Sequence, residues 1–422
     1  MNAIHFPLTG NSAIMALVIL IHVFFAFFAV GGSLIAIFSE WLGQRKKDDA
    51  YMRLARSLSK FLADMMKING VLGVMIIVLI IGLWGTFARF LYSVMFWPFF
   101  IEGLFFLLMM VFSVLYNRTW DRASNGLHLF FGCLAAFFSI LAAFVINAIW
   151  AFMMFPGKWL ETRDGWDAIQ SPILWESFTH MLLPCVINGA LFIFLFSFWK
   201  VKFSDKETDY YKKINRFAAR MSAALIFLQP LSGLSFLWRV NISSQGLAHP
   251  NPWGQLWSGV GTPYLHGMFF LASVAVICAA LYWILGHDNG RKFLLIAAVA
   301  MFTAFFVGGY AREKARKPYL VWGHMYMSQN PVKAKSTGAK KAEGINGASV
   351  YDNEGCGACH LFQGKGGSAG PELEDLNDSF SKDDMKEFLS EPPDDMPPFG
   401  GSEKELEAIA NYLLNPMGKA TP

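Results

Sequence analysis

Charged residues are scarce in this 422-residue sequence, where Asp, Glu, Lys and Arg make up only 16% of the chain. A soluble domain usually carries about 25%, whereas 55% of the residues here are hydrophobic. The composition therefore excludes an ordinary soluble protein and indicates a membrane protein. The formal net charge of +4 is too small to indicate a nucleic-acid partner.

Cysteine is also rare, with five residues in the whole chain. Cys133, Cys185 and Cys278 lie singly in apolar runs, where a cysteine behaves as a small buried hydrophobic residue. The other two, Cys356 and Cys359, lie close together near the C-terminus. Only this second pair has a spacing that indicates a chemical function.

Apolar runs define the expected fold class. Runs of about 20 residues are long enough to cross a hydrocarbon layer of about 30 Å, and eight occur, near 12–38, 66–88, 95–117, 126–154, 173–199, 217–238, 263–286 and 291–312. Alternate connections carry 17 Lys and Arg residues on one side and 4 on the other. The positive-inside rule then places both termini outside the cytoplasmic membrane of a bacterium. We expect an all-α, polytopic membrane bundle of about eight helices.

The composition changes after the last apolar run. Residues 328–347 are rich in Lys, Ala, Gly and Ser and show no apolar periodicity, which predicts a flexible linker between a transmembrane domain at 1–327 and a further domain at 348–422. The last domain has about 75 residues, below the usual size for a self-sufficient core. It is therefore expected to need a cofactor.

The C-terminal cysteines belong to the segment Cys356-Gly-Ala-Cys359-His360. In this spacing two thiols can add to the vinyl groups of a haem, and the next residue can supply an imidazole ligand to the iron. A zinc or thioredoxin-like site is the alternative, but no second Cys or His pair follows to complete a zinc site. Met396 is expected to supply the sixth ligand, and Met385 is the competing candidate.

This C-terminal segment resembles a class I cytochrome c. The resemblance rests on CGACH, then Gly370-Pro371-Glu372-Leu373, then MPPF at 396–399, then an amphipathic stretch at 402–415. It implies a small all-α domain with one covalent haem c. Haem c is attached on the exported side, in agreement with the topology that the charges predict.

Several potential ligands lie at a similar depth in the apolar runs, where polar side chains are costly and often functional. His22 lies roughly 15 Å along the first run, His180 and Glu102 roughly 10 Å into the fifth and third, and Met268 roughly 8 Å into the seventh. Glu313 closes the eighth run on the same side. A structural role is the alternative for each of them, but the shared depth favours a site.

Residues 10–320 resemble subunit I of the cytochrome bd-type oxidases. The resemblance rests on His22 in ILIHVFFAFFAVGG, Asn69 in KINGVLGV, Glu102 in FIEGLFFL, Asn147 in VINAIW, His180 in SFTHMLLPCVINGALFIFLFSFW, Met268 in YLHGMFFLA, and EKARKPY at 313–319, where the family has E-x-G-R-Q-P-W.

The resemblance implies the main haem ligands. His180 and Met268 would bind a low-spin haem b, and His22 and Glu313 would be axial ligands of two further haems, one of them the oxygen site. Glu102 would act there in proton delivery or charge compensation. The expected cofactors are one haem c and one to three haems b, with haem d as the alternative at the oxygen site.

The resemblance also implies supporting roles. Arg316 would neutralise haem propionates, and Asn69, Asn147 and Trp150 would line the pocket. His266 is either a propionate partner or an interfacial structural histidine.

Three departures from the family affect the expected function. The family's long quinol-oxidising loop is replaced by a short connection at 239–262, Met110 stands where the family has a second Glu, and the linker and cytochrome c replace the ninth helix. The short connection and the added cytochrome both favour a cytochrome chain over quinol as the electron donor.

We therefore expect the haem-bearing subunit of a bd-like terminal oxidase that receives electrons through haem c and reduces oxygen to water. One alternative is an electron-transfer subunit of a respiratory complex without oxygen chemistry, and another is a membrane anchor for the cytochrome. The expected partners are a haem-free second membrane subunit and other cytochromes c.

Overall fold

The computed structural model describes the backbone of residues 10–83, 85–162, 164–204, 207–245, 252–257, 261–316, 346–358, 360–363, 365–366, 380–390 and 401–415, together with Leu373, Leu376, Pro392, Met396 and Phe399. At 313–316 the description covers the backbone alone. The chain divides into two compact units, one of which contains residues 16–76 and 94–312 and the other the C-terminal domain.

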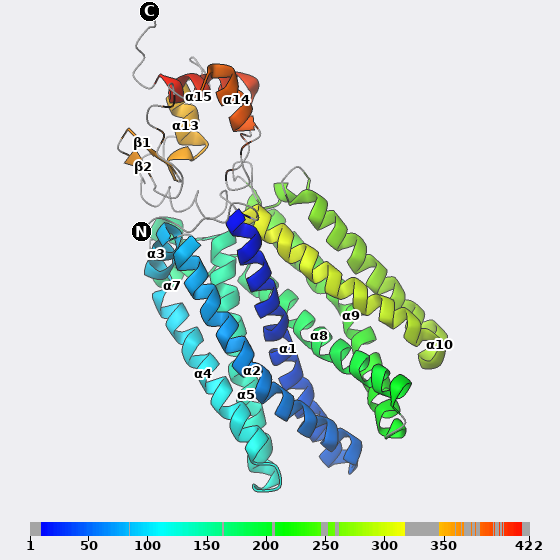
Figure 1. Cartoon of the computed structure of the whole chain (residues 1–422). Coiled ribbons are helices and arrows are strands. Elements are labelled where there is room, and N and C mark those ends of the chain that lie inside the picture. The colour runs from blue at the N-terminus through cyan, green and yellow to red at the C-terminus, as the bar shows by residue number, and fades with distance from the viewer. Residues whose placement is uncertain are drawn as a thin grey trace, which may run out of the picture. The chain divides into compact units, whose positions relative to one another are not determined.

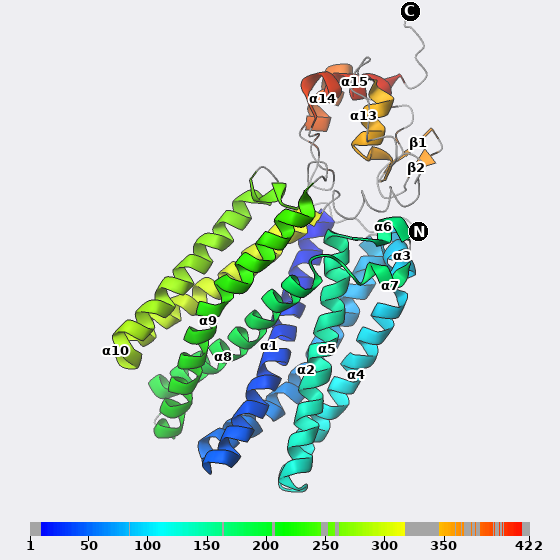
Figure 2. The same cartoon turned by 180° about the vertical axis from the view of Figure 1, so that it is seen from behind.

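Long helices dominate the membrane part (Figures 1 and 2). Within the described residues, seven are long and apolar enough to cross a bilayer: α1 (Gly10–Lys46), α2 (Asp49–Leu83), α4 (Phe96–Arg118), α5 (Asn125–Met154), α8 (Leu174–Phe203), α9 (Thr208–Ser244) and α10 (Thr262–Arg316). The short helices are α3 (Gly85–Val94), α6 (Trp159–Thr162), α7 (Gly165–Ala168) and the 3₁₀ turn η1 (Gly254–Leu256).

Helix α10 supplies two of the eight expected crossings. Its 55 residues would measure about 80 Å as one straight helix, but Gly286, with a φ of 73°, interrupts it. A Cβ on Gly290 would lie 2.7 Å from the backbone of Tyr282, and one on Gly267 would lie 3.8 Å from Val307. The two arms therefore run antiparallel, as Figure 1 shows. Six helices and this hairpin confirm the expected bundle.

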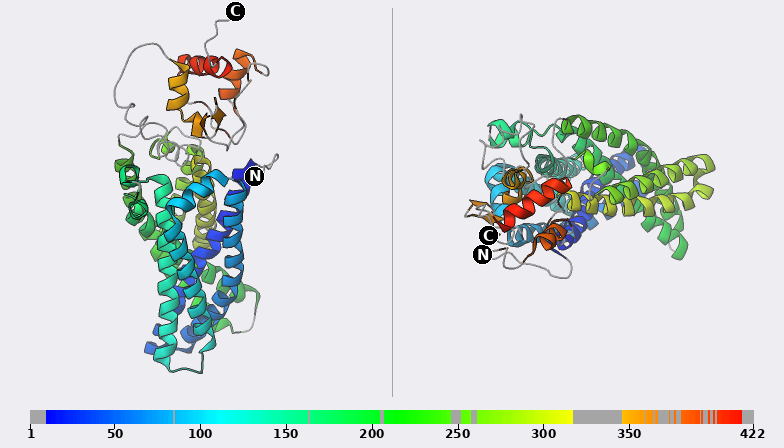
Figure 3. Two further views of the ribbon diagram at one scale, coloured as in Figure 1. Left: turned by 90° about the vertical axis from the view of Figure 1, so that its left-hand side faces the viewer. Right: turned by 90° about the horizontal axis from the view of Figure 1, so that it is seen from above.

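Small residues allow the long helices to approach closely, as is usual in membrane bundles. A Cβ on Gly31 of α1 would lie 1.9 Å from the carbonyl oxygen of Cys185 on α8. Ala218 and Ala219 of α9 are almost fully buried in the cluster that surrounds Phe194. Figure 3 shows the resulting bundle of helices from the side and from above.

The C-terminal domain has its own small core. It contains α13 (Gly347–Asn353), the turn η2 (Cys356–Ala358), the antiparallel pair β1 (Leu361–Phe362) and β2 (Lys365–Gly366), α14 (Lys382–Ser390) and α15 (Glu403–Leu414). The predicted terminal helix at 402–415 is confirmed. Ser402 and Glu405 form a capping box at its start. Almost all of the predicted linker, 328–347, lies outside the described residues.

Candidate functional site

His180 on α8 rests against one face of α9. Its Nδ1 is 3.0 Å from Nε2 of Gln229 and 3.3 Å from Oγ of Ser232, and its ring stacks on Phe236 with centroids 5.6 Å apart. A Cβ on Gly233 would lie 3.4 Å from Cε1 of the imidazole. These α9 residues recur at helical spacing, so one helix face fixes the orientation of the ring.

The side-chain oxygen of Gln229 is a second possible partner for His180. Its Oε1 is buried without a hydrogen-bond partner among the described atoms. Rotating the amide by 180° exchanges nitrogen and oxygen, so that Oε1 can accept a hydrogen bond from Nδ1–H of His180, in exchange for the 3.3 Å hydrogen bond that Nε2 donates to the carbonyl oxygen of His180. That tautomer leaves Nε2 of His180 free to bind a metal, which is how ligating histidines are usually held.

His22 on α1 is half-buried and faces α2. A Cβ on Gly73 would lie 3.3 Å from Cε1 of the His22 ring. Nδ1 of His22 and Oδ1 of Asn69, one turn before Gly73, are both buried without a hydrogen-bond partner among the described atoms. An unsatisfied buried polar group costs about 1–3 kcal/mol. These two atoms therefore fit a site that a bound polar or metal-containing group completes.

Met268 on the first arm of α10 lies against Gly308 on the second arm. A Cβ on Gly308 would lie 2.4 Å from the Met268 sulfur, so the thioether would have to move if residue 308 carried a side chain. His22, His180 and Met268 thus share an arrangement in which a potential ligand faces a glycine, and the small residue leaves space beside it. Within the described residues, no hydrogen bond joins His180 to Met268. His180 lies against α9, whereas Met268 lies against the second arm of α10.

Glu102 on α4 is half-buried. Among the described residues it forms no hydrogen bond or ion pair, and a Cβ on the neighbouring Gly103 would meet nothing within 4 Å. A carboxyl group in this position can take up or release a proton without breaking a structural contact. Met110, two turns later, is also half-buried and cannot exchange protons.

Asn147 joins two of the helices that carry this site. Its Nδ2 donates a hydrogen bond to Oγ of Ser177 at 2.9 Å and one to the carbonyl oxygen of Leu174 at 3.3 Å. Asn147 is 4% exposed. The amide therefore fixes α5 to α8 one turn before His180, which is a positioning task in addition to the expected lining of a pocket.

An arginine that the sequence argument missed lies at the end of α10. The guanidinium of Arg312 lies 4.4 Å from the ring centroid of Trp150, within cation–π range. The side chains of Glu313 and Arg316, which the sequence argument selected, lie outside the described residues. Arg312 precedes Glu313 directly, so the same motif was the signal that could have found it.

His266 has a local structural contact. Its Nε2 lies 2.8 Å from the carbonyl oxygen of Leu256, which joins α10 to η1. Of the two expected roles, the structural one has a contact to support it.

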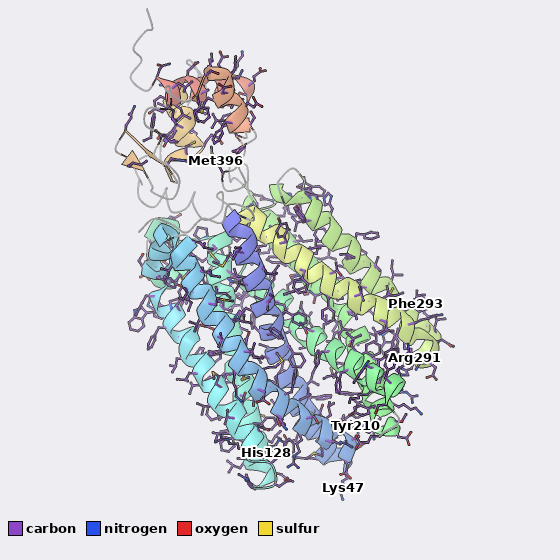
Figure 4. All side chains as sticks on the ribbon, in the orientation of Figure 1. Lys47, His128, Tyr210, Arg291, Phe293 and Met396 are labelled. Carbon is purple, nitrogen blue, oxygen red and sulfur yellow. The ribbon has the colours of Figure 1, made fainter. Side chains whose placement is uncertain are left out.

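The C-terminal motif packs around a separate core. The backbone N–H of His360 donates to the carbonyl oxygen of Cys356 at 3.0 Å, and His360 is 8% exposed. Met385 is fully within the core, whereas Met396 is half-buried at its edge (Figure 4). Cys359 lies outside the described residues. Met385 is therefore a core side chain, whereas Met396 packs against the outside of the core and remains partly exposed.

A buried polar cluster at the opposite end of the bundle was also missed. Tyr116 donates a hydrogen bond of 2.7 Å to Oε2 of Glu40, Gln44 donates one of 2.9 Å to Oε1, and His128 Nε2 lies 3.6 Å from Oε2. Figure 4 labels His128 at this end. Glu40 is fully buried. A glutamate at the end of an apolar run was the available signal.

Two family models match the chain. The model for cytochrome bd terminal oxidase subunit I matches residues 12–236, just over half of the chain. That range contains His22, Glu102 and His180 but ends before Met268 and Glu313. The model for cytochrome c oxidase, cbb3-type, subunit III matches residues 342–413.

Individual relatives also match the membrane part and the C-terminal domain separately. The chain is 29% identical over 205 residues to cytochrome bd ubiquinol oxidase subunit 1 of Bacillus subtilis, which is 46% of this chain and 43% of that protein. The chain thus spans less than half the length of that relative. It is 36% identical over 75 residues to cytochrome c-555 of Methylococcus capsulatus, which is 18% of this chain and 61% of that protein.

A solved structure shares the fold. The bd oxidase from Geobacillus thermodenitrificans superimposes with a TM-score of 0.65 at 19% sequence identity, over 76% of this chain and 89% of that one. The expected fold of the membrane part is thereby confirmed.

Proposed function

Because this chain belongs to the cytochrome bd terminal oxidase subunit I family, we propose that it is the haem-bearing subunit of a bd-like respiratory oxidase whose electrons enter through its own cytochrome c domain. One observation carries the proposal. A single chain joins a bd-type bundle, with His22, His180 and Met268 each facing a glycine, to a segment that matches a cytochrome c model. The domain limits are 1–327, 328–347 and 348–422.

The half-buried residues His22, His180 and Met268 suit the proposed cofactors. His180, oriented by Gln229, and Met268 would hold a low-spin haem b, and His22 and Glu313 would hold two further haems at this end of the bundle. Bound haem supplies one-electron transfer and, where an axial position is open, oxygen binding. Glu102 would carry the proton, since its carboxyl group has no competing partner among the described residues.

The remaining residues would position the helices and neutralise the haem propionates. Asn69 and Asn147 would fix the helices beside the ligands, and the Trp150 ring would orient the Arg312 guanidinium. Arg312 and Arg316, one turn apart at the end of α10, would balance negatively charged propionates. In the C-terminal domain, Cys356 and Cys359 would bind haem c, with His360 and Met396 as axial ligands.

Two features support a cytochrome donor in place of quinol. The connection between α9 and α10 covers only residues 245–261 and includes η1, so it offers no room for a long quinol-binding insert. The domain at 348–422 contains 15 Asp and Glu but only five Lys and Arg. An acidic domain attracts a basic donor protein.

A haem-free second membrane subunit is the proposed partner, in a bacterial cytoplasmic membrane with the cytochrome domain on the outer side. Two helices expose apolar faces that such a subunit would cover. On α2 these include Val71, Val74 and Val78, and on α4 they include Phe100 and Leu107.

The second candidate is an electron-transfer subunit without oxygen chemistry. Met110 favours it, because a thioether replaces the family's second glutamate and interrupts that route for protons.

Spectra of reduced membranes with and without carbon monoxide distinguish the two candidates, because the gas binds only a haem with an open axial position. An oxidase gives a shifted spectrum, and an unshifted spectrum excludes it. Extraction of the pigments then counts the haems and identifies haem b or haem d. The variant His180→Ala should lose one b-type signal and keep haem c, and Thr179→Ala on the same helix is the matched control.

A further inference from the structure

A cavity of about 370 Å³ opens at the end of the bundle opposite to His180, beside the starts of α2 and α9. Figure 4 labels Tyr210 and Lys47 at this end. Four basic side chains line the cavity, Lys212, Lys213, Arg216 and Arg220, with one carboxylate, Asp209. The loops at this end carry most of the basic residues, so it is the end expected to face the cytoplasm.

The basic side chains are arranged for an anion. Lys212, Arg216 and Arg220 are spaced by four residues, so they follow one face of α9 about 6 Å apart. Among the described residues, no carboxylate lies within 4 Å of Arg216 or Arg220, whereas Lys213 is ion-paired with Asp48. The charges of the two arginines therefore remain available, and a guanidinium group suits the paired oxygens of a phosphate.

Tyrosine side chains hold part of the basic wall in place. Lys213 lies 5.4 Å from the ring centroid of Tyr51, which also lines the cavity. Arg220 interacts with the hydroxyl of the buried Tyr282. Fixed side chains lose less entropy when an anion binds.

The other wall of the cavity is aromatic and continues onto the outer surface of α1. The ring of Phe217 lies edge-on to Tyr51 at 5.2 Å and stacks on Phe38 at 6.3 Å, and Phe38 stacks on Trp41 at 5.8 Å. Phe38 is 44% and Trp41 42% exposed. We call these four rings the aromatic ladder. It leads from the cavity to an apolar surface of a membrane-spanning helix.

We propose that this cavity binds the phosphate headgroup of an anionic membrane phospholipid, with its acyl chains along the aromatic ladder. A free phosphate would use the basic wall alone, whereas a lipid uses both walls. Basic pockets between membrane helices on the cytoplasmic side suit such headgroups.

The test uses purified full-length protein, washed extensively in neutral detergent and titrated with dioctanoyl phosphatidylglycerol while bound lipid is counted by native mass spectrometry. The double variant Lys212→Gln/Arg216→Gln removes two charges from the cavity. Its matched control, Lys200→Gln/Lys202→Gln, removes two charges from the end of α8, outside the residues that line the cavity. A second variant, Phe38→Ala, shortens the ladder without a change in charge.

We expect the cavity variant to bind this lipid about thirtyfold more weakly, since each of the two basic residues that it removes contributes about 1 kcal/mol near an anionic lipid. The control should bind as the unmodified protein does. Phe38→Ala should weaken lipid binding severalfold and leave any binding of inorganic phosphate unchanged. Equal lipid binding by the cavity variant and its control overturns the proposal. Inorganic phosphate or ATP that displaces the lipid at equal concentration also overturns it, in favour of a soluble ligand.

Discussion

Nδ1 of His180 on α8 lies 3.0 Å from the side-chain amide of Gln229 on α9. If His180 ligates a low-spin haem through Nε2, a hydrogen bond from Nδ1–H to the amide oxygen strengthens the imidazole as a donor and favours ferric iron. The substitution Gln229→Leu should therefore raise the midpoint potential of that haem. A hydrogen bond of about 1 kcal/mol corresponds to roughly 40 mV for one electron.

Redox titration of the b-type absorption measures this shift. Gln170→Leu, in the connection between α7 and α8, is the control and should leave the potential unchanged. A Gln229→Leu protein with an unaltered potential but lower thermal stability would reduce Gln229 to a packing role.

The two candidate methionines of the C-terminal domain should respond differently to truncation. If Met396 is the axial ligand, Met396→Ala removes a thioether that favours ferrous haem, so the haem c potential should fall by more than about 100 mV, while the fold persists. Met385 is 3% exposed in the core, so Met385→Ala should cost about 2–5 kcal/mol of stability and leave the potential nearly unchanged. Titration and urea unfolding of both variants measure these effects, and the reverse pattern would make Met385 the ligand.

The helices could be predicted because a helix that crosses a membrane needs a long run of apolar residues, which is easy to recognise in a sequence. The run at 95–117 became α4 (Phe96–Arg118), and the run at 126–154 became α5 (Asn125–Met154). The run at 217–238 is shorter than the helix that contains it, α9, which starts at Thr208. Charged residues continue that helix beyond the hydrocarbon layer, where apolar content no longer reports on helix length.

The site was only partly predictable. His22 and His180 stood out because polar groups are rare at membrane depth, and Met268 stood out because it lies at a similar depth in a segment that resembles the family. Gln229 was passed over because its importance depends on which residue α9 turns toward His180, and helix rotation is set by packing between segments distant in sequence. The Glu40–Tyr116 contact likewise joins residues 76 positions apart.

Tyr116 should be important for stability at the end of the bundle that contains Glu40. Tyr116→Phe removes the hydroxyl that donates to the buried Glu40 carboxyl, and a hydrogen bond to a charged group contributes about 1.5–3 kcal/mol. We expect a loss of about 2 kcal/mol in the unfolding free energy of the purified protein. Tyr211→Phe, on a half-buried tyrosine of α9, is the control. Equal unfolding curves for the two variants would show that Glu40 does not depend on this donor.

The capping box of α15 predicts a dependence on pH. The hydroxyl and backbone N–H of Ser402 both donate to Glu405 and hold the pKa of its carboxyl below the usual value. The stabilisation is therefore complete above the unfolded-state pKa and is lost as the pH falls through the folded-state pKa. Ser402→Ala should cost about 1 kcal/mol at neutral pH and progressively less in acid.

Urea unfolding of the full chain, followed through haem c absorption at several pH values, measures the capping effect. Ser390→Ala is a suitable control, because that hydroxyl donates within its own helix to the carbonyl oxygen of Lys386. If the loss of unfolding free energy caused by Ser402→Ala stays constant down to strongly acidic pH, the ionised Glu405 carboxyl does not contribute to the capping effect.

The acidic C-terminal domain should select its electron donor by charge. Asp383 and Glu387 of α14 are exposed, and attraction between oppositely charged surfaces accelerates association in a way that salt screens. Reduction of haem c by a basic cytochrome should therefore slow at least about tenfold between low and physiological ionic strength. Asp383→Lys/Glu387→Lys should slow it severalfold at low salt, whereas Glu161→Lys/Asp167→Lys in the membrane part should not. Stopped-flow rates measure both effects, and a salt-independent rate would point to a donor that docks through apolar contacts.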